Sequence, residues 1–265
     1  MSEQLIVEIT DLGIASITLN RPDKGNAFSS KTIQALIGTL HSIKENKSVR
    51  CLILRGKGKH FSTGADLNWM KSMAKCSYED NLADAEQLAL LMSTLDELPI
   101  PTIAAVQGCA FGGALGLICC CDIVIAERSS IACFSEVKLG LVPATIAPYA
   151  IRAIGARAAR RYMLSAEKIS AHTALELGLY HQLCNANQLE PELVQCINSV
   201  LANSPNAIRD TKALIRQCTN AIDPSLIRQT VTVIANARVS TQGQHGLNAF
   251  FDKVPPDWST KVDEQ

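Results

Sequence analysis

The chain has 265 residues, of which 47% are hydrophobic and 19% charged, so it can bury a substantial core as one large domain or one domain with an appendage. Basic and acidic residues number 25 each, and this neutral balance argues against a dedicated nucleic-acid binder. The opening MSEQLIVEIT has no basic stretch or long apolar core, and the apolar run near 114–126 is too short to span a bilayer. We therefore expect a cytoplasmic protein with no membrane or nucleic-acid partner.

Strand and helix patterns alternate over the first half of the chain. Strands with β-branched, often alternating residues are expected at 5–10, 14–20, 49–56, 102–108 and 122–127. Helices are expected at 29–46, with Ser29 or Ser30 as N-cap, at 78–98, ended by Pro99, and at 112–121. A glycine-bearing loop fills 56–67. This alternation predicts an α/β core with a mainly parallel sheet.

The pattern changes beyond residue 143. Apolar residues at helical spacing predict helices at 157–164, 170–178, 191–204, 206–221 and 225–240. A short strand is expected near 180–183. The predicted organisation is an α/β core over 1–200 followed by a helical region over 201–265.

Ten cysteines are scattered along the chain, mostly in apolar surroundings. Without a secretion signal, reduced thiols that pack in the core are the better interpretation. Cys119, Cys120 and Cys121 are adjacent, so on a helix they point in different directions, and no second ligand cluster has zinc-like spacing. No metal site is expected.

Two glycine-containing loops precede helices, at 61–67 and 109–115. Neither matches a phosphate-binding fingerprint. A backbone N–H in the first turn of a helix lacks an intrahelical partner, and two such groups that converge on one point form an oxyanion hole. The alternative is that both loops are only tight connections between strand and helix.

Glu136 lies in the largely apolar segment CFSEVKLGLVP, where a strand is expected to give way to a turn. Apolar neighbours raise the pKa of a carboxyl group, which can then act as a general acid or base. A salt bridge to Lys138 or to a nearby arginine is the competing interpretation.

Six motifs occur in this order: LNRPDKGNAF, GKHFSTGADL, PTIAAVQGCAFGGALGL, CDIVIA, SEVKLGLVP and ISAHTALELGL. Together they resemble the enoyl-CoA hydratase/isomerase (crotonase) superfamily over nearly the whole chain. The resemblance implies a spiral of ββα repeats with a C-terminal helical trimerisation part. It also implies a homotrimer or a hexamer built as a dimer of trimers.

The resemblance further implies chemistry on acyl-CoA thioesters, with coenzyme A as part of the substrate and no separate cofactor. The backbone N–H groups of Ala65 and Gly113 match the oxyanion donors, and we expect Gly113 to tolerate no side chain. Positions matching contacts to the substrate and its coenzyme A are Lys24, Asn26, Ala27, Gly64, Ala65, Asp66, Leu67, Gly112, Gly113, Phe250 and Lys253.

The sequence departs from the family's usual pattern at one of two positions that carry catalytic glutamates. Glu136 matches one, with Ser135 in place of a proline, but Gly116 stands where the other is usual. Three explanations remain: a hydratase in which Glu136 alone handles water, an isomerase with a single base, or a protein that only binds thioesters or a partner. Acids that could replace the missing glutamate are Asp66, Glu79 and Asp84.

The sequence looks most like a bacterial branch that contains methylglutaconyl-CoA and isohexenylglutaconyl-CoA hydratases, and this favours the hydratase. Such substrates carry a distal carboxylate, for which candidate cations are Lys71, Lys75, Lys138 and Arg152. A mammalian methylglutaconyl-CoA hydratase binds RNA through a lysine-rich helix. The matching helix here has lysines only at 31, 44 and 47, so RNA binding is not expected.

Overall fold

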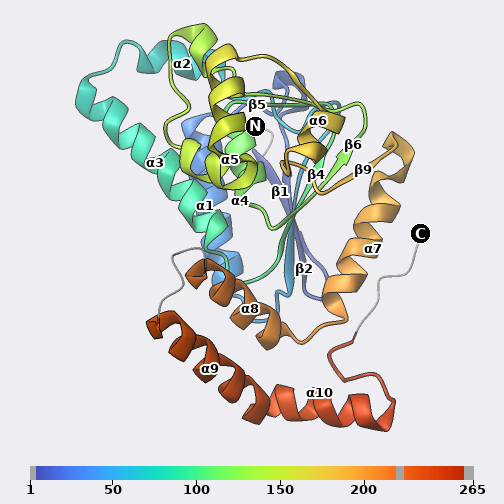
Figure 1. The fold of residues 1–265 in the computed structure, drawn as a ribbon. Coiled ribbons are helices and arrows are strands. Elements are labelled where there is room, and N and C mark those ends of the chain that lie inside the picture. Colours follow the sequence, from blue (N-terminus) through green and yellow to red (C-terminus); the bar gives the residue numbers. More distant parts are fainter. Residues whose placement is uncertain (1–3, 219–223, 260–265) are drawn as a thin grey trace. The chain divides into compact units, whose positions relative to one another are not determined.

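The computed structural model (Figure 1) describes residues 4–218 and 224–259. Its larger sheet has the strand order β1-β2-β3-β4-β6-β9, in which β1 is antiparallel to β2 and the other neighbours are parallel. The strands are β1 (Leu5–Ile9), β2 (Ile14–Leu19), β3 (Cys51–Gly56), β4 (Thr102–Val106), β6 (Ile123–Glu127) and β9 (Gln182–Cys184). All five residues of β4 are buried, as expected of a central parallel strand covered on both faces.

The smaller sheet contains three short strands, β5 (Cys109–Phe111), β7 (Ile131–Cys133) and β8 (Ile169–Ser170). Isolated parallel bridges join Phe28 to Ala65 and Ser62 to Ala110. Thus β3, β4 and β6 are each followed by a short segment that pairs in this second layer. This arrangement confirms the predicted α/β fold.

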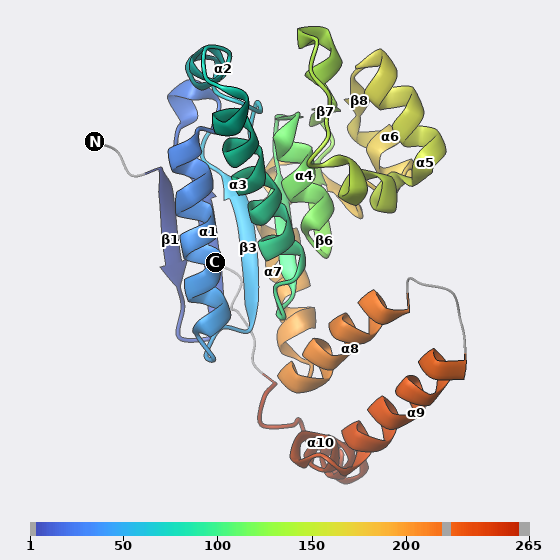
Figure 2. The ribbon, with the colours of Figure 1, turned by 90° about the vertical axis from the view of Figure 1, so that its left-hand side faces the viewer.

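Four helices follow these strand pairs: α1 (Ser30–Glu45), α2 (Leu67–Met73), α3 (Tyr78–Asp96) and α4 (Gly113–Cys120). In α1, apolar side chains at helical spacing, including Ile33, Leu36 and Leu40, are buried. Ser29 is the N-cap of α1 and forms a capping box with Thr32. Figures 1 and 2 show α1 and α3 side by side. Helix α2 begins where the glycine-containing loop at 61–67 ends, as the sequence indicated without giving its length.

Helix α5 (Ala147–Ser165) is longer than the predicted segment at 157–164. Gly155 interrupts it with φ 74° and ψ 155°, so the helical pattern restarts at that point. Helix α6 (Ala171–Glu176) agrees with the expected segment at 170–178. The 3-10 turns are η1 (Pro22–Lys24), η2 (Glu136–Leu139) and η3 (Ala186–Gln188).

The C-terminal helices are α7 (Leu189–Leu201), α8 (Pro205–Gln217), α9 (Pro224–Val239) and α10 (Thr241–Asp252). Contacts divide the described residues into one unit of 4–98 and 102–193 and a second of 99–101, 194–218 and 224–259. The division falls within α7. The sequence reading did not anticipate α10.

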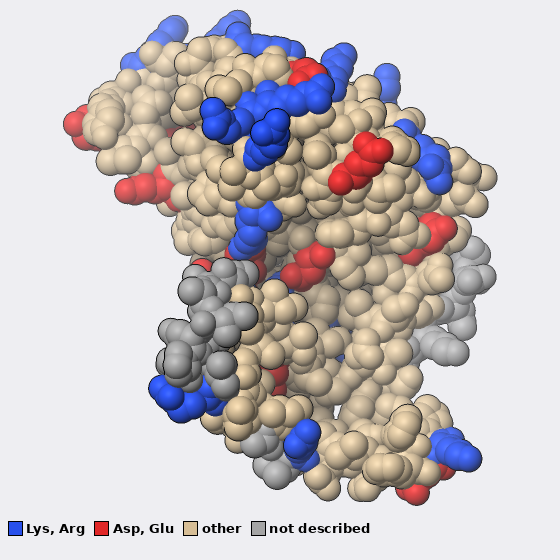
Figure 3. Space-filling model, in the orientation of Figure 1, with Lys and Arg blue, Asp and Glu red and all other residues tan. Residues whose placement is uncertain are grey.

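Charged groups of both signs are interspersed on the face that Figure 3 shows, among many uncharged residues. Searched over 4–218 and 224–259, no helix has the length and apolar character to cross a membrane. All ten cysteines are described and none forms a disulfide. Burial raises the pKa of Cys119 to about 12, so this thiol stays protonated and behaves as a core residue.

Candidate active site

The segment that contains Ala65 is held in place by backbone hydrogen bonds to Phe28. Phe28 N donates to Gly64 O (2.7 Å), and Asp66 N donates to Phe28 O (2.7 Å). This pattern of a parallel bridge uses the groups on either side of Ala65 and turns its own N–H the other way. Within the described part of the chain, the Ala65 N–H has no hydrogen-bond acceptor.

Gly113 begins α4, directly after β5. Gly112 N donates to Cys133 O (2.9 Å), and Leu115 N donates to Gly112 O (2.9 Å). The Gly113 N–H is in the first turn, where the helix itself supplies no acceptor, and the helix dipole favours negative charge there. The geometry therefore presents a second backbone donor at the position that the sequence indicated.

Backbone hydrogen bonds join the segment that leads to Ala65 to the segment that leads to Gly113. Phe61 N donates to Gln107 O (2.8 Å), Ser62 N to Cys109 O (3.1 Å) and Phe111 N to Ser62 O (3.0 Å). A Cβ on Gly64 would lie 2.9 Å from the carbonyl oxygen of Phe111, so the two segments also approach closely near their ends. Preorganised donors of this kind stabilise developing negative charge without reorganisation.

The carboxyl group of Glu136 lies close to Gly112, which precedes Gly113. Its Oε1 lies 3.2 Å from where a Cβ on Gly112 would be. Its Oε2 is buried and has no hydrogen-bond partner. Burial raises the pKa of Glu136, and its own backbone N–H offsets this in part. No ion pair to Lys138 is formed among the described residues, so the competing salt-bridge interpretation is wrong.

The requirement for glycine falls on Gly112 rather than on Gly113. Gly112 has φ 55° and ψ −125°, which L side chains rarely adopt, and it faces Glu136. A Cβ on Gly113 would lie 3.4 Å from Cδ2 of Phe28, an ordinary van der Waals contact. The expectation that Gly113 tolerates no side chain is therefore wrong for a methyl group.

Gly116 is buried, and its surroundings are filled. A Cβ there would lie 2.4 Å from Ile146 Cγ2 and 2.8 Å from Met92 Sδ. Ile146 is 1% exposed and Met92 is fully buried. The position where the family usually has a second glutamate thus has no room even for a methyl group without movement of these side chains.

The three acids that could replace that glutamate have different surroundings. Asp66 pairs with Arg21 and caps α2, and the hydrogen bond from Arg21 holds its pKa below the ordinary value. Glu79 is exposed in the first turn of α3. Asp84 is half-buried on α3, and burial raises its pKa. The pKa of Asp84 is thus shifted in the direction opposite to that of Asp66.

Residues expected to contact coenzyme A divide into exposed and structural positions. Lys24, Leu67 and Phe250 are exposed and available to a ligand. Ala27 and Gly64 are buried. These coenzyme A contacts stay predictions.

Asn26 is buried, with φ 56°. Its amide donates to Lys57 O (3.0 Å) and His60 O (2.7 Å), and its Oδ1 accepts from Arg21 N. Its side chain therefore holds two loops together rather than facing a ligand.

The cation candidates for a distal carboxylate also differ. Arg152 donates to both carboxylate oxygens of Asp96 and lies over the ring of Tyr149, so its charge is already paired. Lys71, Lys75 and Lys138 are exposed. Lys253, at the end of α10 in the second unit, has φ 57° and is exposed.

Two participants were missed in the sequence. Arg21 joins the segments around Ala65, and Ile146 fills the space beside Gly116. Arg21 stands within the LNRPDKGNAF motif, which is a local signal. Nothing in the sequence places Ile146 against Gly116, thirty positions earlier. Over the described ranges, no group of three or more His, Cys, Asp or Glu side chains is placed to hold a metal ion.

The described structure thus places a carboxyl group with one buried, unpaired oxygen at the start of α4, where the Gly113 N–H lies, and joins this segment by hydrogen bonds to the one that leads to Ala65. The model of the family described as "Enoyl-CoA hydratase/isomerase" matches residues 10–261, and the chain belongs to this family. The family acts on acyl-CoA thioesters.

Individual relatives agree with this assignment. A solved enoyl-CoA hydratase from Shewanella pealeana is 48% identical, with a TM-score of 0.93, over 97% of this chain and 96% of that one. The enoyl-CoA hydratase ACTT6 of Alternaria alternata is 37% identical over 90% of this chain and 78% of its own. The 2,3-dehydroadipyl-CoA hydratase of Escherichia coli is 30% identical over 91% and 93%, respectively.

Proposed function

We propose that this protein is an enoyl-CoA hydratase that adds water across the 2,3 double bond with Glu136 as its single catalytic carboxyl group. The observation that carries this proposal is the buried, unpaired Oε2 of Glu136 beside Gly112, at the start of α4. A carboxyl group with a raised pKa can exchange protons with water and with carbon near neutral pH.

The reaction balances with one carboxyl group. The Glu136 carboxylate takes a proton from water as the water oxygen bonds to C3 of the enoyl thioester. Negative charge moves to the thioester oxygen, where the N–H groups of Ala65 and Gly113 stabilise it. Glu136 then gives its proton to C2, and the carboxylate is restored.

A Δ3-Δ2 enoyl-CoA isomerase is the second candidate, because the space beside Gly116 is filled by Ile146 and Met92. An isomerase needs only one base, which moves a proton between C2 and C4, and no second carboxyl group to hold water. Binding of thioesters without turnover is the third outcome.

The proposed acyl group is a methylglutaconyl type with a distal carboxylate. The E. coli relative is named for 2,3-dehydroadipyl-CoA, which also carries a dicarboxylic acyl group. Because Arg152 is paired with Asp96, Lys71, Lys75 and Lys138 are the better candidates to meet that carboxylate.

The test is to incubate the pure protein with a panel of CoA thioesters and to follow the products by mass and by chromatography. Hydration adds the mass of water, and this is the expected result. Isomerisation gives a new species of unchanged mass. Unaltered substrate with measurable binding would show that the protein binds thioesters without turnover.

We also propose a trimer or a dimer of trimers. Large apolar side chains are exposed on the second unit, among them Val231, Ile234 and Phe251. Isolated exposed apolar residues are common, but several on consecutive helices indicate a surface that other copies of the chain cover. Sedimentation should give a mass that is a multiple of three chains, and a folded monomer at micromolar concentration would refute this.

A further inference from the structure

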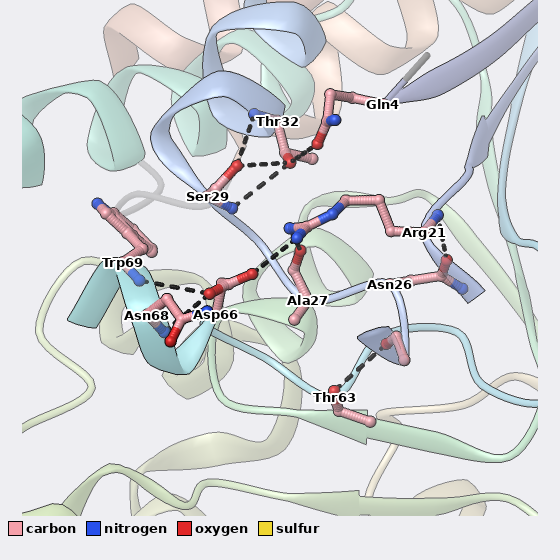
Figure 4. A network of polar contacts seen from close by, with 11 residues as sticks. Gln4, Arg21, Asn26, Ala27, Ser29, Thr32, Thr63, Asp66, Asn68 and Trp69 are labelled. Atoms are coloured by element: carbon pink, nitrogen blue, oxygen red, sulfur yellow. Dashed lines mark hydrogen bonds and ion pairs between the residues drawn. The ribbon is translucent and has the colours of Figure 1, made fainter. Parts of the chain in front are cut away.

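Arg21 lies on the turn after β2, outside the atoms assigned to the reaction. Its side chain is 19% exposed. Nη1 donates to Ala27 O (2.8 Å), and Nη2 donates to Asp66 Oδ2 (2.7 Å). Figure 4 shows the guanidinium reaching between Ala27 and Asp66, which come from different loops.

The two acceptors of Arg21 flank the bridge that positions Ala65. Ala27 precedes Phe28, Asp66 follows Ala65, and Phe28 and Ala65 are the bridge partners. One planar guanidinium therefore fixes a neighbour of each partner. Because its N–H groups form a rigid fork, it constrains the separation of the two loops as well as supplying charge.

Asp66 extends this constraint into α2. Its Oδ1 accepts from Asn68 N (2.9 Å) and Trp69 N (3.3 Å), so it is the N-cap of the helix. Ala65 is thus held between the bridge to Phe28 and a helix start that Arg21 anchors. The turn that carries Arg21 is itself fixed, because Arg21 N donates to Asn26 Oδ1 (2.9 Å).

The competing explanation is that the pair only stabilises the fold. A structural pair would serve anywhere along these loops, whereas both contacts of Arg21 are made one residue from the bridge partners. Capping of α2 also needs only the carboxylate of Asp66, not Arg21. The contact to Ala27 has no part in the cap and serves only to join the two loops.

We propose that Arg21 is a positioning residue of the reaction, which acts through Ala27 and Asp66 to aim the Ala65 N–H at the thioester oxygen. This inference rests on the oxyanion assignment in the proposed function. A lysine at position 21 keeps the charge but is a point donor on a flexible stem, so it cannot hold both loops in the same geometry.

The experiment compares Arg21→Lys and Asp66→Asn with the unaltered protein. Asn retains a capping oxygen for α2 and removes the charge. The measurements are kcat, the dissociation constant of a CoA thioester, thermal unfolding, and the infrared stretch of an isotope-labelled thioester carbonyl in the bound state. That stretch moves to lower frequency as hydrogen bonds polarise the carbonyl. The control is Arg55→Lys, because Arg55, on β3 of the larger sheet, forms a 2.8 Å pair with Glu190 of α7 and does not contact the loops around Ala65.

For Arg21→Lys we expect kcat to fall roughly 10- to 100-fold, as for a small misplacement of a catalytic group. The thioester affinity should change by only a few-fold, and the downshift of the carbonyl stretch should shrink. Asp66→Asn should change the same quantities in the same direction. Arg55→Lys should leave kcat and the stretch unchanged.

A normal kcat and carbonyl stretch in both variants would overturn the inference. So would a lower unfolding temperature with an unchanged stretch, because that is the signature of a purely structural pair. If the unaltered protein itself shows no downshift, the oxyanion assignment fails and this inference with it. The failure of the proposed function is therefore visible before any variant is made.

Discussion

Two neighbouring positions of α4, its N-cap Gly112 and Gly116 one turn later, have opposite surroundings. At its start, Gly112 faces the carboxyl group of Glu136, whose Oε2 has no partner. One turn later, Gly116 is pressed against Ile146 and Met92. The start of the helix holds a polar group at the cost of desolvation. The position of Gly116 is ordinary core, so the space that a second carboxyl group would need is filled by other side chains.

The largest effect is expected from Glu136→Gln, which keeps the shape and removes the ionisable group. Turnover should fall by about 10²–10⁴ or more, because no second carboxyl group at Gly116 can take over. Affinity for CoA thioesters should survive. The variant is compared with Asp84→Asn on the best substrate of the panel. If Asp84→Asn is the more harmful and Glu136→Gln keeps near-normal turnover, the single-carboxyl mechanism is wrong.

A smaller effect separates the adjacent glycines at the start of α4. Gly112→Ala forces a side chain to φ 55° and against Glu136, so we expect a loss of roughly 10²–10³ in kcat, similar to loss of an oxyanion donor. Gly113→Ala adds a methyl group in ordinary contact with Phe28 and should be mild. Steady-state kinetics on both variants decide the matter, and equal losses would contradict the assignment of strain to Gly112.

A change at Gly116, one turn into the helix, should affect stability. Gly116→Ala overpacks the site against Ile146 and Met92, and should lower the free energy of unfolding by about 1–3 kcal/mol. Denaturant unfolding measures this, and the double variant with Ile146→Ala should recover part of the loss. Gly116→Glu should not raise turnover. A faster Gly116→Glu enzyme would show that the space is available after all.

The smallest effect concerns pH. Burial raises the pKa of Glu136 above its ordinary value of 4.5. Since the carboxylate form must take the first proton, activity should be lost as the pH falls through this raised pKa. The acid limb of kcat against pH should therefore lie above 4.5. A limb at or below that value would indicate a group without this desolvation.

Local patterns in the sequence predicted much of the first unit. Ser29 was one of two expected N-caps, and β4 was expected as a strand, because each signal lies within a few neighbouring residues. The segment β5 was missed because three residues are too few to show a period, and it pairs only with a distant part of the chain. A strand before the turn at Glu136 and a helix after the loop at 61–67 were expected without bounds, and β7 and α2 lie at these places.

The site was predictable to the extent that it resides in motifs. Glu136 has the raised pKa that its apolar neighbours suggested, whereas the roles of Ala65 and Gly113 as oxyanion donors stay predictions. The partners of Asn26 and the filling of Gly116 could not be read, because both depend on side chains brought together by folding. Spacing along the sequence does not identify which side chain fills a given space in the folded protein.

The contact between Gly116 and Ile146 has an evolutionary consequence. A glutamate restored at position 116 would meet a space already filled by Ile146 and Met92, so it would be harmful before it could be useful. These neighbours must move or be replaced by smaller side chains to admit it. A glutamate at position 116 is therefore expected to need a second change, at position 146 or 92, before it can be accommodated.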